Sequence, residues 1–417
     1  MRQIAVGVVF LLVWSLCGCG EESIAQVSYT GSKVPGATDT GNFSGVDPAS
    51  QVPTTPFAAN ITISEVAAYQ TVKVTLMKDG QTVSNRQAPI VGEKDAFLRV
   101  FVEPQPGWAS REIIATLSLE SSSQTHPSQS VKKFVTSASS DRGIDSTFNF
   151  NIDGSLLEGD LQYSVTLFEA TTGDVTGDTS GALWPSGGKA MFNADTSNHT
   201  LEIVLVPIRY NSDGSGRLPD VSAAQVERYR AALSAMYPAA TVDIRVRETL
   251  DWQDQISAFG QGWGQLLSGL QGLRSQDGAS SREYYYGVFS PASSYQNFCR
   301  QGCVGGLSSL AQDYRYSQAR TSIGLGFSGD ATAATLVHEV GHAHGREHAP
   351  CGLMGQASDR NFPNDTAKLE EWGFDARDQS LMAPSATYVD MMSYCNPIWV
   401  SAYTYNALAD RIVAVNS

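Results

Sequence analysis

The sequence reads HEVGHAHGREH from His338 to His348, which places four of the six histidines of the chain within eleven residues. Residues four apart on an α-helix lie only about 40° apart around its axis, so His338 and His342 would present their imidazoles from one face. Two ligands for one metal ion are arranged in this way by local structure alone. The spacing predicts a helix that starts near Asp330 and carries both side chains.

A third ligand requires the chain to change direction after this helix. Gly345 stands where the change is expected, because glycine readily adopts the left-handed conformation that commonly ends helices. The chain would then bring His348 back to the first two histidines. Three imidazoles with one open position are typical of a catalytic zinc site. His344 points about 200° away from His342 on an ideal helix, so we predict a packing role for it.

Glu339 directly follows the first predicted ligand. A carboxylate at this position can reach a metal-bound water and accept its proton, which is the general-base role of H-E-x-x-H helices. The whole pattern, H-E-x-x-H-x-x-G-x-x-H, contains three residues of a type that is rare in this chain. We therefore treat it as specific, against the alternative of a histidine-rich surface loop.

The stretch resembles the zinc-binding consensus of the metzincin clan of metallopeptidases, whose members also carry a methionine turn beneath the metal. Asp390-Met391-Met392-Ser393-Tyr394 follows and resembles that turn in the serralysin-like and astacin-like branches. The resemblance implies that Met392, rather than its rival Met391, is the methionine of the turn. It also places Tyr394 near the zinc, where a phenol can donate to a developing oxyanion. A buried core tyrosine is the alternative.

The resemblance implies a zinc-dependent endopeptidase that hydrolyses peptide bonds of extracellular proteins or peptides, glycosylated ones included, with Zn²⁺ as its cofactor and Glu339 as general base. One departure is Ala349, since several branches of the clan place an acidic residue there. Two other functions remain open. The chain could be an adhesin or binding lipoprotein with a catalytically degenerate zinc domain, or it could hydrolyse a non-peptide amide or ester.

In this clan an edge strand that precedes the active-site helix pairs with the substrate backbone. The resemblance therefore offers two candidates for the substrate strand, residues Ser308–Leu310 and residues Thr321–Gly326.

The N-terminus predicts export. Residues 4–16 form an apolar run preceded by Arg2, and this run is shorter than the roughly 20 residues that a membrane-spanning helix needs. We interpret residues 1–18 as a signal peptide. Leu16-Cys17-Gly18-Cys19 resembles the lipobox of bacterial lipoproteins, which implies lipidation at Cys19. The mature protein would then be anchored by lipid to a bacterial membrane, facing the periplasm or the cell surface, or be released outside; ordinary signal cleavage is the alternative.

Four cysteines outside the N-terminal region, Cys299, Cys303, Cys351 and Cys395, allow three pairings in an oxidising compartment. Two of them stand close in sequence to the predicted zinc site, since Cys351 follows the third histidine and Cys395 follows the methionine turn. By the resemblance, a Cys351–Cys395 bridge would tie the ligand loop to that turn. Cys299–Cys303 would then be the second bridge.

Composition changes along the chain predict a multidomain protein. Residues 19–59 are rich in Gly, Ser, Thr and Pro and are interpreted as a flexible linker. Residues 60–200 contain short β-rich segments between turn residues, which predicts an antiparallel, Ig-like β-sandwich. Residues 201–417 alternate apolar strands with helical patterns, which predicts a mixed α/β domain of metzincin type.

The charge excludes one class of partner. The chain has 28 Lys and Arg against 42 Asp and Glu, a net charge of −14. Because binding to nucleic acids depends on neutralising phosphates with basic side chains, we expect no nucleic-acid partner. We also expect contact with a membrane only through the lipid anchor, and a monomer.

Overall fold

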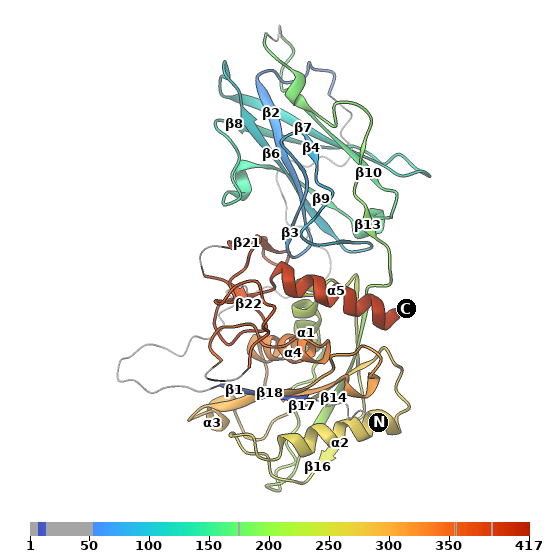
Figure 1. The fold of residues 1–417 in the computed structure, drawn as a ribbon, viewed down its shortest axis with the longest axis vertical. Helices are drawn as coiled ribbons and strands as arrows, with labels where there is room; N and C mark the ends of the chain where they lie inside the picture. The colour runs from blue at the N-terminus through green and yellow to red at the C-terminus, as the bar shows by residue number, and fades with distance from the viewer. Residues whose placement is uncertain (1–6, 14–52, 174–175, 354, 356, 385–386) are drawn as a thin grey trace, which may run out of the picture. The chain divides into compact units, whose positions relative to one another are not determined.

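The computed structural model describes residues 7–13, 53–173, 176–353, 355, 357–384 and 387–417 (Figure 1). The chain divides into two compact units. The β unit contains Lys33–Ser197 and Glu371–Ala383, and the α/β unit contains Met1–Ser32, Asn198–Glu370 and Pro384–Ser417. Cys19 and residues 19–52 of the predicted linker lie outside the described residues. Ala58 and Ala59, at the end of that linker, are buried in the β unit.

The β unit is built from two antiparallel sheets, and burial alternates along β9, as expected for a strand with one face inward. The first sheet has the order β4-β3-β2-β6-β9, and its strands are β2 (Ile61–Tyr69), β3 (Lys73–Lys78), β4 (Gln81–Thr82), β6 (Ala96–Pro104) and β9 (Phe148–Ile152). The second has the order β11-β10-β7-β8 with β12 also on β10, and its strands are β7 (Arg111–Glu120), β8 (Gln129–Val135), β10 (Gln162–Glu169), β11 (Leu183–Trp184) and β12 (Ala190–Met191). The predicted N-terminal antiparallel sheets are confirmed.

Smaller elements complete this unit. A short parallel pair joins β5 (Ile90–Val91) to β13 (Ala194–Asp195). Three single turns of 3₁₀ helix lie between the strands, at Ile144–Ser146, Gly154–Leu156 and Ser180–Ala182.

A hairpin from later in the chain also belongs to the β unit. It consists of β20 (Gly373–Asp375) and β21 (Ser380–Met382), which lie in sequence between the third histidine and the methionine turn. Phe374 stacks on Phe97 with ring centroids 4.6 Å apart, and its backbone N–H donates to Thr71 O at 2.8 Å. This return to the β unit leaves no signal in the sequence, because aromatic stacking between residues so far apart produces no local pattern.

The α/β unit is organised around a mixed sheet of order β1-β18-β19-β17-β14-β15, with β16 also on β14. Its strands are β1 (Gly7–Val13), β14 (Thr200–Tyr210), β15 (Thr241–Val246), β16 (Leu250–Trp252), β17 (Tyr284–Phe289), β18 (Cys303–Leu310) and β19 (Thr321–Leu325). Neighbouring strands are parallel except at β18, which is antiparallel to both β19 and β1. The predicted mixed α/β region is confirmed.

Helices cover both faces of this sheet (Figure 1). The helices are α1 (Ala223–Met236), α2 (Trp263–Gln276), α3 (Tyr295–Phe298), α4 (Asp330–Ala343) and α5 (Ala402–Asn416), with a 3₁₀ turn at Ser317–Ala319. Helices α1 and α4 lie against one face, and α2 lies against the other. The N-cap of α1 is Ser222, whose hydroxyl accepts from Gln225 N–H.

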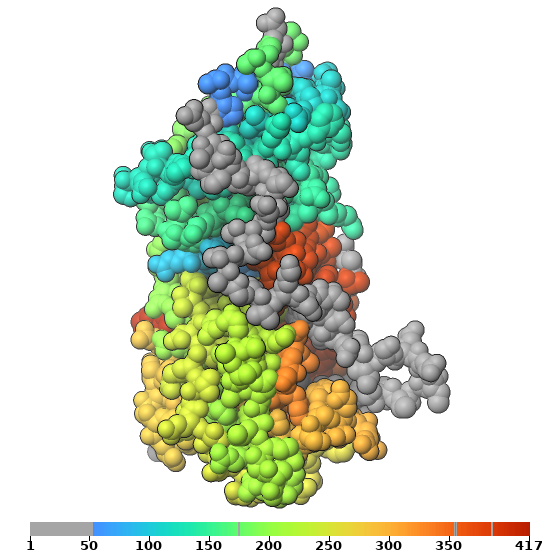
Figure 2. All heavy atoms as spheres, turned by 180° about the vertical axis from the view of Figure 1, so that it is seen from behind, coloured from blue at the N-terminus to red at the C-terminus, as the bar shows by residue number. Residues whose placement is uncertain are grey.

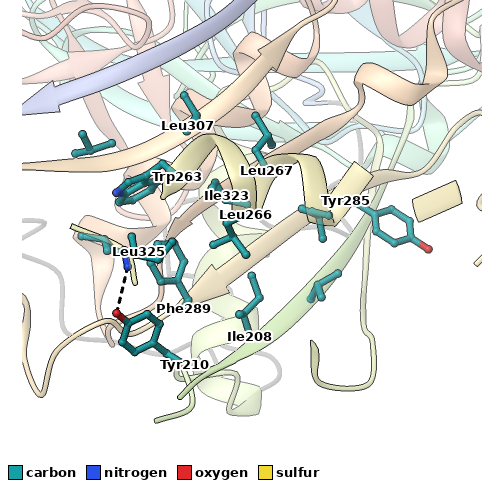
Figure 3. Close-up of a cluster of buried hydrophobic side chains, with 14 of the residues drawn as sticks. Ile208, Tyr210, Trp263, Leu266, Leu267, Tyr285, Phe289, Leu307, Ile323 and Leu325 are labelled. Carbon is teal, nitrogen blue, oxygen red and sulfur yellow. Dashed lines mark hydrogen bonds between the residues drawn. The ribbon is translucent and has the colours of Figure 1, made fainter. Parts of the chain in front are cut away.

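The face under α2 contains an extensive hydrophobic core. Trp263 and Leu266 of α2 are fully buried against Phe289 and Ile323 of the strands, as Figure 3 shows. At its border the Ile256 N–H donates to the phenol of Tyr210 at 3.2 Å. On the side shown in Figure 2, green to yellow segments between β14 and β17 form much of the surface of this unit. The sheet is thus covered on one face by α2 and its core, and α4 packs on the opposite face.

Residues 7–13, within the predicted signal peptide, form β1 at the outer side of β18. The pairing is antiparallel and aligns Gly7 with Leu310 and Val13 with Cys303. Among the described residues, the helices are all too short or too polar to cross a membrane.

We expect Phe374→Ala to lower the stability of the β unit by about 3–5 kcal/mol, because it removes a buried aromatic ring and leaves a cavity. Urea unfolding followed by fluorescence measures this change. Phe134→Ala is the matched control, since Phe134 is 60% exposed in the same unit. Equal midpoints for the two variants would contradict the packing described for the hairpin.

Candidate active site

Helix α4 carries the predicted motif and is fixed to the sheet by hydrogen bonds. The Ser322 hydroxyl of β19 donates to Glu339 O at 3.1 Å, and the Tyr237 phenol donates to Val337 O at 2.7 Å. The helix ends at Ala343, and Gly345 follows with a positive φ of 84°. This is the left-handed turn that the sequence predicted. A side chain at Gly345 would also meet Ala311 O at 2.6 Å, so glycine is required twice over.

The structure brings His338, His342 and His348 together. The Nε2 atom of His342 lies 3.1 Å from Nε2 of His338 and 3.1 Å from Nε2 of His348. All three side chains are buried. The Nδ1 atom of His338 lies 2.8 Å from Met391 O, and that of His342 lies 2.6 Å from Arg346 O. The predicted triad is therefore assembled.

These contacts fit a metal ion. A carbonyl oxygen can only accept, so Nδ1 of His338 and of His342 must carry the proton and each Nε2 must present a lone pair. Lone pairs that face one another at 3.1 Å repel unless a cation lies between them. Ligands at tetrahedral positions around zinc would be roughly 3.3 Å apart for Zn–N bonds of about 2.0–2.1 Å. The donor set and its spacing thus match a three-histidine metal site.

Electrostatics point the same way. Burial lowers the pKa of His338 to about 4 and that of His348 to about 3, and it lowers the pKa of His342 well below its ordinary value. Neutral imidazoles are the form that binds a metal. Burial also raises the pKa of Glu339 well above its ordinary value. A nearby cation is the group that would return this carboxyl to its ionised form.

Glu339 is completely buried, and neither of its carboxylate oxygens has a hydrogen-bond partner among the described residues. It lies against β18 at Gly306, where an added Cβ would meet Oε1 at 2.5 Å and Cγ at 2.6 Å. Only glycine leaves room for the carboxylate there. An unpartnered, buried carboxylate next to the first ligand is the expected arrangement for a group whose partner is a reactant.

The methionine turn lies beneath α4, between β22 (Val389–Asp390) and β23 (Ile398–Trp399). Met392 approaches the helix so closely that a Cβ on Gly341 would meet its sulfur at 2.5 Å. Asp390 shapes the turn, because its carboxylate accepts from Met392 N–H at 2.8 Å and from Ser401 N–H at 2.9 Å. Of the two methionines, Met392 thus packs under the helix, while Met391 contributes its carbonyl to His338.

Tyr394 lies beside the triad, with its ring centroid 4.7 Å from that of His348 and 6.0 Å from that of His338.

The Cys351–Cys395 disulfide connects the ligand loop to the turn, and Cys299–Cys303 forms the second bridge. Both predicted pairings are confirmed.

Of the remaining predictions, the one for His344 is confirmed and the one for residues 321–326 is wrong. His344 packs away from the triad and stacks on Tyr284 at 4.1 Å, in agreement with a packing role. Residues Thr321–Gly326 are wrong as an edge strand, because β19 has β18 on one side and β17 on the other. Ser308–Leu310 belongs to β18 and stays the candidate.

Several residues of the site were not identified from the sequence. They are Gly306, Gly341 and Asp390, each of which acts through a close tertiary contact. The glycines of β18 were visible as a cluster, but nothing in the sequence showed that Glu339 would pack on one of them. Asp390 stands directly before the two methionines, and this position was the one feature of the sequence that could have identified it as a residue of the site.

Comparison with known proteins identifies the family that the site region matches. Residues 308–403, which run from the last residues of β18 through the triad and the methionine turn to the start of α5, match the family Peptidase M66. The chain thus contains a metalloprotease region similar to Peptidase M66. The predicted resemblance to metzincin-type metallopeptidases is confirmed, and a peptidase acts on proteins or peptides.

The comparisons with solved structures and with curated proteins do not identify a function. Among solved structures, the chain is similar to metalloproteinase-II from Bacteroides fragilis, with 13% identity over 82% of this chain and 87% of the other, at a TM-score of 0.28. A likeness this distant does not bear on the function. None of the curated proteins matches the chain.

Gly306→Ala should reduce kcat by about 100-fold, because the added methyl group must push the Glu339 carboxylate from its place. Metal content, measured by atomic absorption, should stay at the wild-type level. Gly264→Ala serves as control, since its Cβ would meet nothing within 4 Å. Full activity of the Gly306 variant would refute the packing of Glu339 on β18.

The metal-free protein should lose stability as pH falls from about 6.5 to about 4. The unfolded histidines titrate near 6.5, whereas burial holds the pKa of His338 at about 4 and that of His348 at about 3. Below pH 6.5 the unfolded state therefore binds more protons and is favoured. Thermal unfolding of chelator-treated protein tests this. A flat profile would contradict the burial of the three histidines.

Proposed function

We propose that this protein is a zinc-dependent endopeptidase that cleaves extracellular proteins, with Glu339 as general base. The observation that carries the proposal is the convergence of three neutral imidazoles beside a buried carboxylate that lacks a protein partner. His338, His342 and His348 would hold the zinc. When bound, zinc polarises a peptide carbonyl and lowers the pKa of a coordinated water to about 7.

The side chains would share the remaining work. Glu339 accepts a proton from the attacking water and delivers it to the leaving amine, which its position directly after the first ligand supports. Tyr394, beside His348, donates its phenolic proton to the oxyanion that forms on the scissile carbonyl. Met392 supplies a polarizable apolar floor under the ligands.

The substrate backbone would pair with the outer side of β18. That side accepts an antiparallel strand, since β1 occupies it with six aligned pairs from Gly7–Leu310 to Val13–Cys303. If residues 1–18 are removed as a signal peptide, the same edge becomes free for an extended peptide. Gly306 lies in this strand and contacts Glu339, so a peptide bound there would pass next to the general base.

The finer features of the sequence complete the proposal. Cys19 carries the lipid that anchors the mature protein to a bacterial membrane, at the periplasmic or cell-surface face. The alternative is that the protein is released outside the cell. The two antiparallel sheets form an Ig-like sandwich. Glycosylated proteins are among the substrates. The alternative, an adhesin with a degenerate zinc domain, is disfavoured because the triad and Glu339 are complete.

Glu339→Ala should abolish most cleavage of unfolded casein, with a loss of about 10²–10⁴-fold in kcat, since general-base catalysis contributes about that much. The variant should still bind one zinc per chain, because the triad does not depend on this carboxylate. Cleavage assays and metal analysis are made side by side on the full chain, and a chelator should stop the wild-type reaction. Undiminished turnover by the variant would refute the role of Glu339.

A further inference from the structure

Asp359 lies outside the motif yet contacts the third ligand and the loop that leads to it. It is 8% exposed and stands eleven residues after the third ligand. Its backbone N–H donates to the carbonyl of His348 at 2.8 Å. Its carboxylate accepts from Arg346 Nη2 at 2.9 Å. One residue thus holds the ligand loop at two points.

Arg346 extends this connection to the second ligand. Its backbone carbonyl lies 2.6 Å from Nδ1 of His342, which donates to it. The orientation of that carbonyl decides how the imidazole of His342 is turned and therefore where its Nε2 lone pair points. Fixing the Arg346 side chain restricts the rotation of the peptide that carries the carbonyl.

Helix α5 joins this hydrogen-bond network through Tyr403. The Tyr403 phenol donates to the same Oδ2 atom of Asp359 at 2.8 Å, and its ring lies under the Arg346 guanidinium at 5.0 Å. Phe362 packs against Tyr403 with ring centroids 5.3 Å apart. The other oxygen, Oδ1, accepts from Asn361 N–H at 2.9 Å. Both oxygens of the carboxylate are therefore hydrogen-bonded, and one of them is held by helix α5.

The loop needs such support. Gly345, in its left-handed conformation, leaves the helix, and the residues that follow have no regular secondary structure up to the third ligand. A glycine hinge followed by irregular chain can move, whereas a three-histidine site requires its donors within a few tenths of an ångström. The Arg346–Asp359 pair is largely shielded, with side-chain exposures of 14% and 9%, so that water screens it little.

We propose that Asp359 is a positioning residue of the metal centre, which holds His342 through Arg346 and His348 through its own backbone. This inference rests on the proposed zinc site and adds a residue that acts through the ligands. Asp359 touches neither metal nor substrate. Its effect should appear in metal affinity and in ligand geometry before it appears in substrate binding.

The test uses the full-length protein and three single variants, Asp359→Asn, Asp359→Ala and Tyr403→Phe. Zinc affinity is measured by competition with a chromophoric chelator. We expect the two Asp359 variants to bind zinc about 10–100-fold more weakly, as loss of a group that orients a ligand does. Tyr403→Phe, which removes one hydrogen bond, should weaken binding about 5-fold. The control Asp213→Asn breaks an exposed ion pair with Arg217 and should leave affinity unchanged.

A spectroscopic readout separates positioning from general stability. The visible absorption of the Co²⁺-substituted protein reports ligand geometry, and it should change in the Asp359 variants but not in Asp213→Asn. The double variant Asp359→Leu/Arg346→Met removes the charge pair without leaving an unpaired charge. If Asp359 merely neutralises Arg346, this variant recovers wild-type affinity; if Asp359 positions the ligands, affinity stays low.

Wild-type zinc affinity and an unchanged cobalt spectrum in the Asp359 variants would overturn this inference while leaving the proposed function intact. Recovery of affinity in the double variant would also overturn it. If Asp359→Ala fails to fold, Tyr403→Phe decides the matter, because it keeps the ion pair, and wild-type affinity in that variant counts against the proposal. A wild-type protein that binds no zinc would overturn the proposed function and this inference together.

Discussion

The active site depends on three buried imidazoles whose ligand nitrogens face one another, with Nε2 of His342 only 3.1 Å from Nε2 of His338 and from Nε2 of His348. Carbonyl oxygens at Met391 and Arg346 take the Nδ1 protons of two of the rings, so the Nε2 atoms must face inward as acceptors. Burial keeps the rings neutral. The protein therefore stores an unfavourable arrangement that a divalent ion relieves, and the surrounding structure must be stiff enough to maintain it.

This stiffness comes from the close packing of the methionine turn and the sheet against α4. Below the helix, the Met392 sulfur leaves no room for a side chain at Gly341. Beside it, β18 leaves room for Glu339 only because residue 306 is glycine. On the far side of the sheet, α2 fills the core with Trp263 and leucines. Small residues at the contacts and large ones behind them let the helix lie close to both the sheet and the turn.

Long-range connections bring the two ends of the site together. The third ligand and the methionine turn are 44 residues apart, and the Cys351–Cys395 disulfide joins their loops. Within that interval the chain leaves the α/β unit and contributes a hairpin to the β unit, where Phe374 stacks on Phe97. Asp390 and Asp359 then fix the loops by hydrogen bonds to backbone groups. Each of these contacts joins residues whose relation cannot be read from their order along the chain.

What the sequence by itself determined was local. The i, i+4 spacing of His338 and His342 and the glycine at 345 are properties of helix geometry and backbone freedom, so the triad, the general base and the turn after α4 could be predicted from eleven residues. Short β-rich segments between turn residues likewise predicted the N-terminal antiparallel sheets, and apolar strands alternating with helical patterns predicted the mixed α/β region. Only the tertiary structure decided that β19 lies inside the sheet, with β18 on one side and β17 on the other. It also decided that Gly306 accommodates Glu339 and that the 371–383 segment packs on the β unit. The physical reason is that periodicity records which face of an element is buried, whereas packing partners are chosen by shape and hydrogen bonding across long stretches of chain.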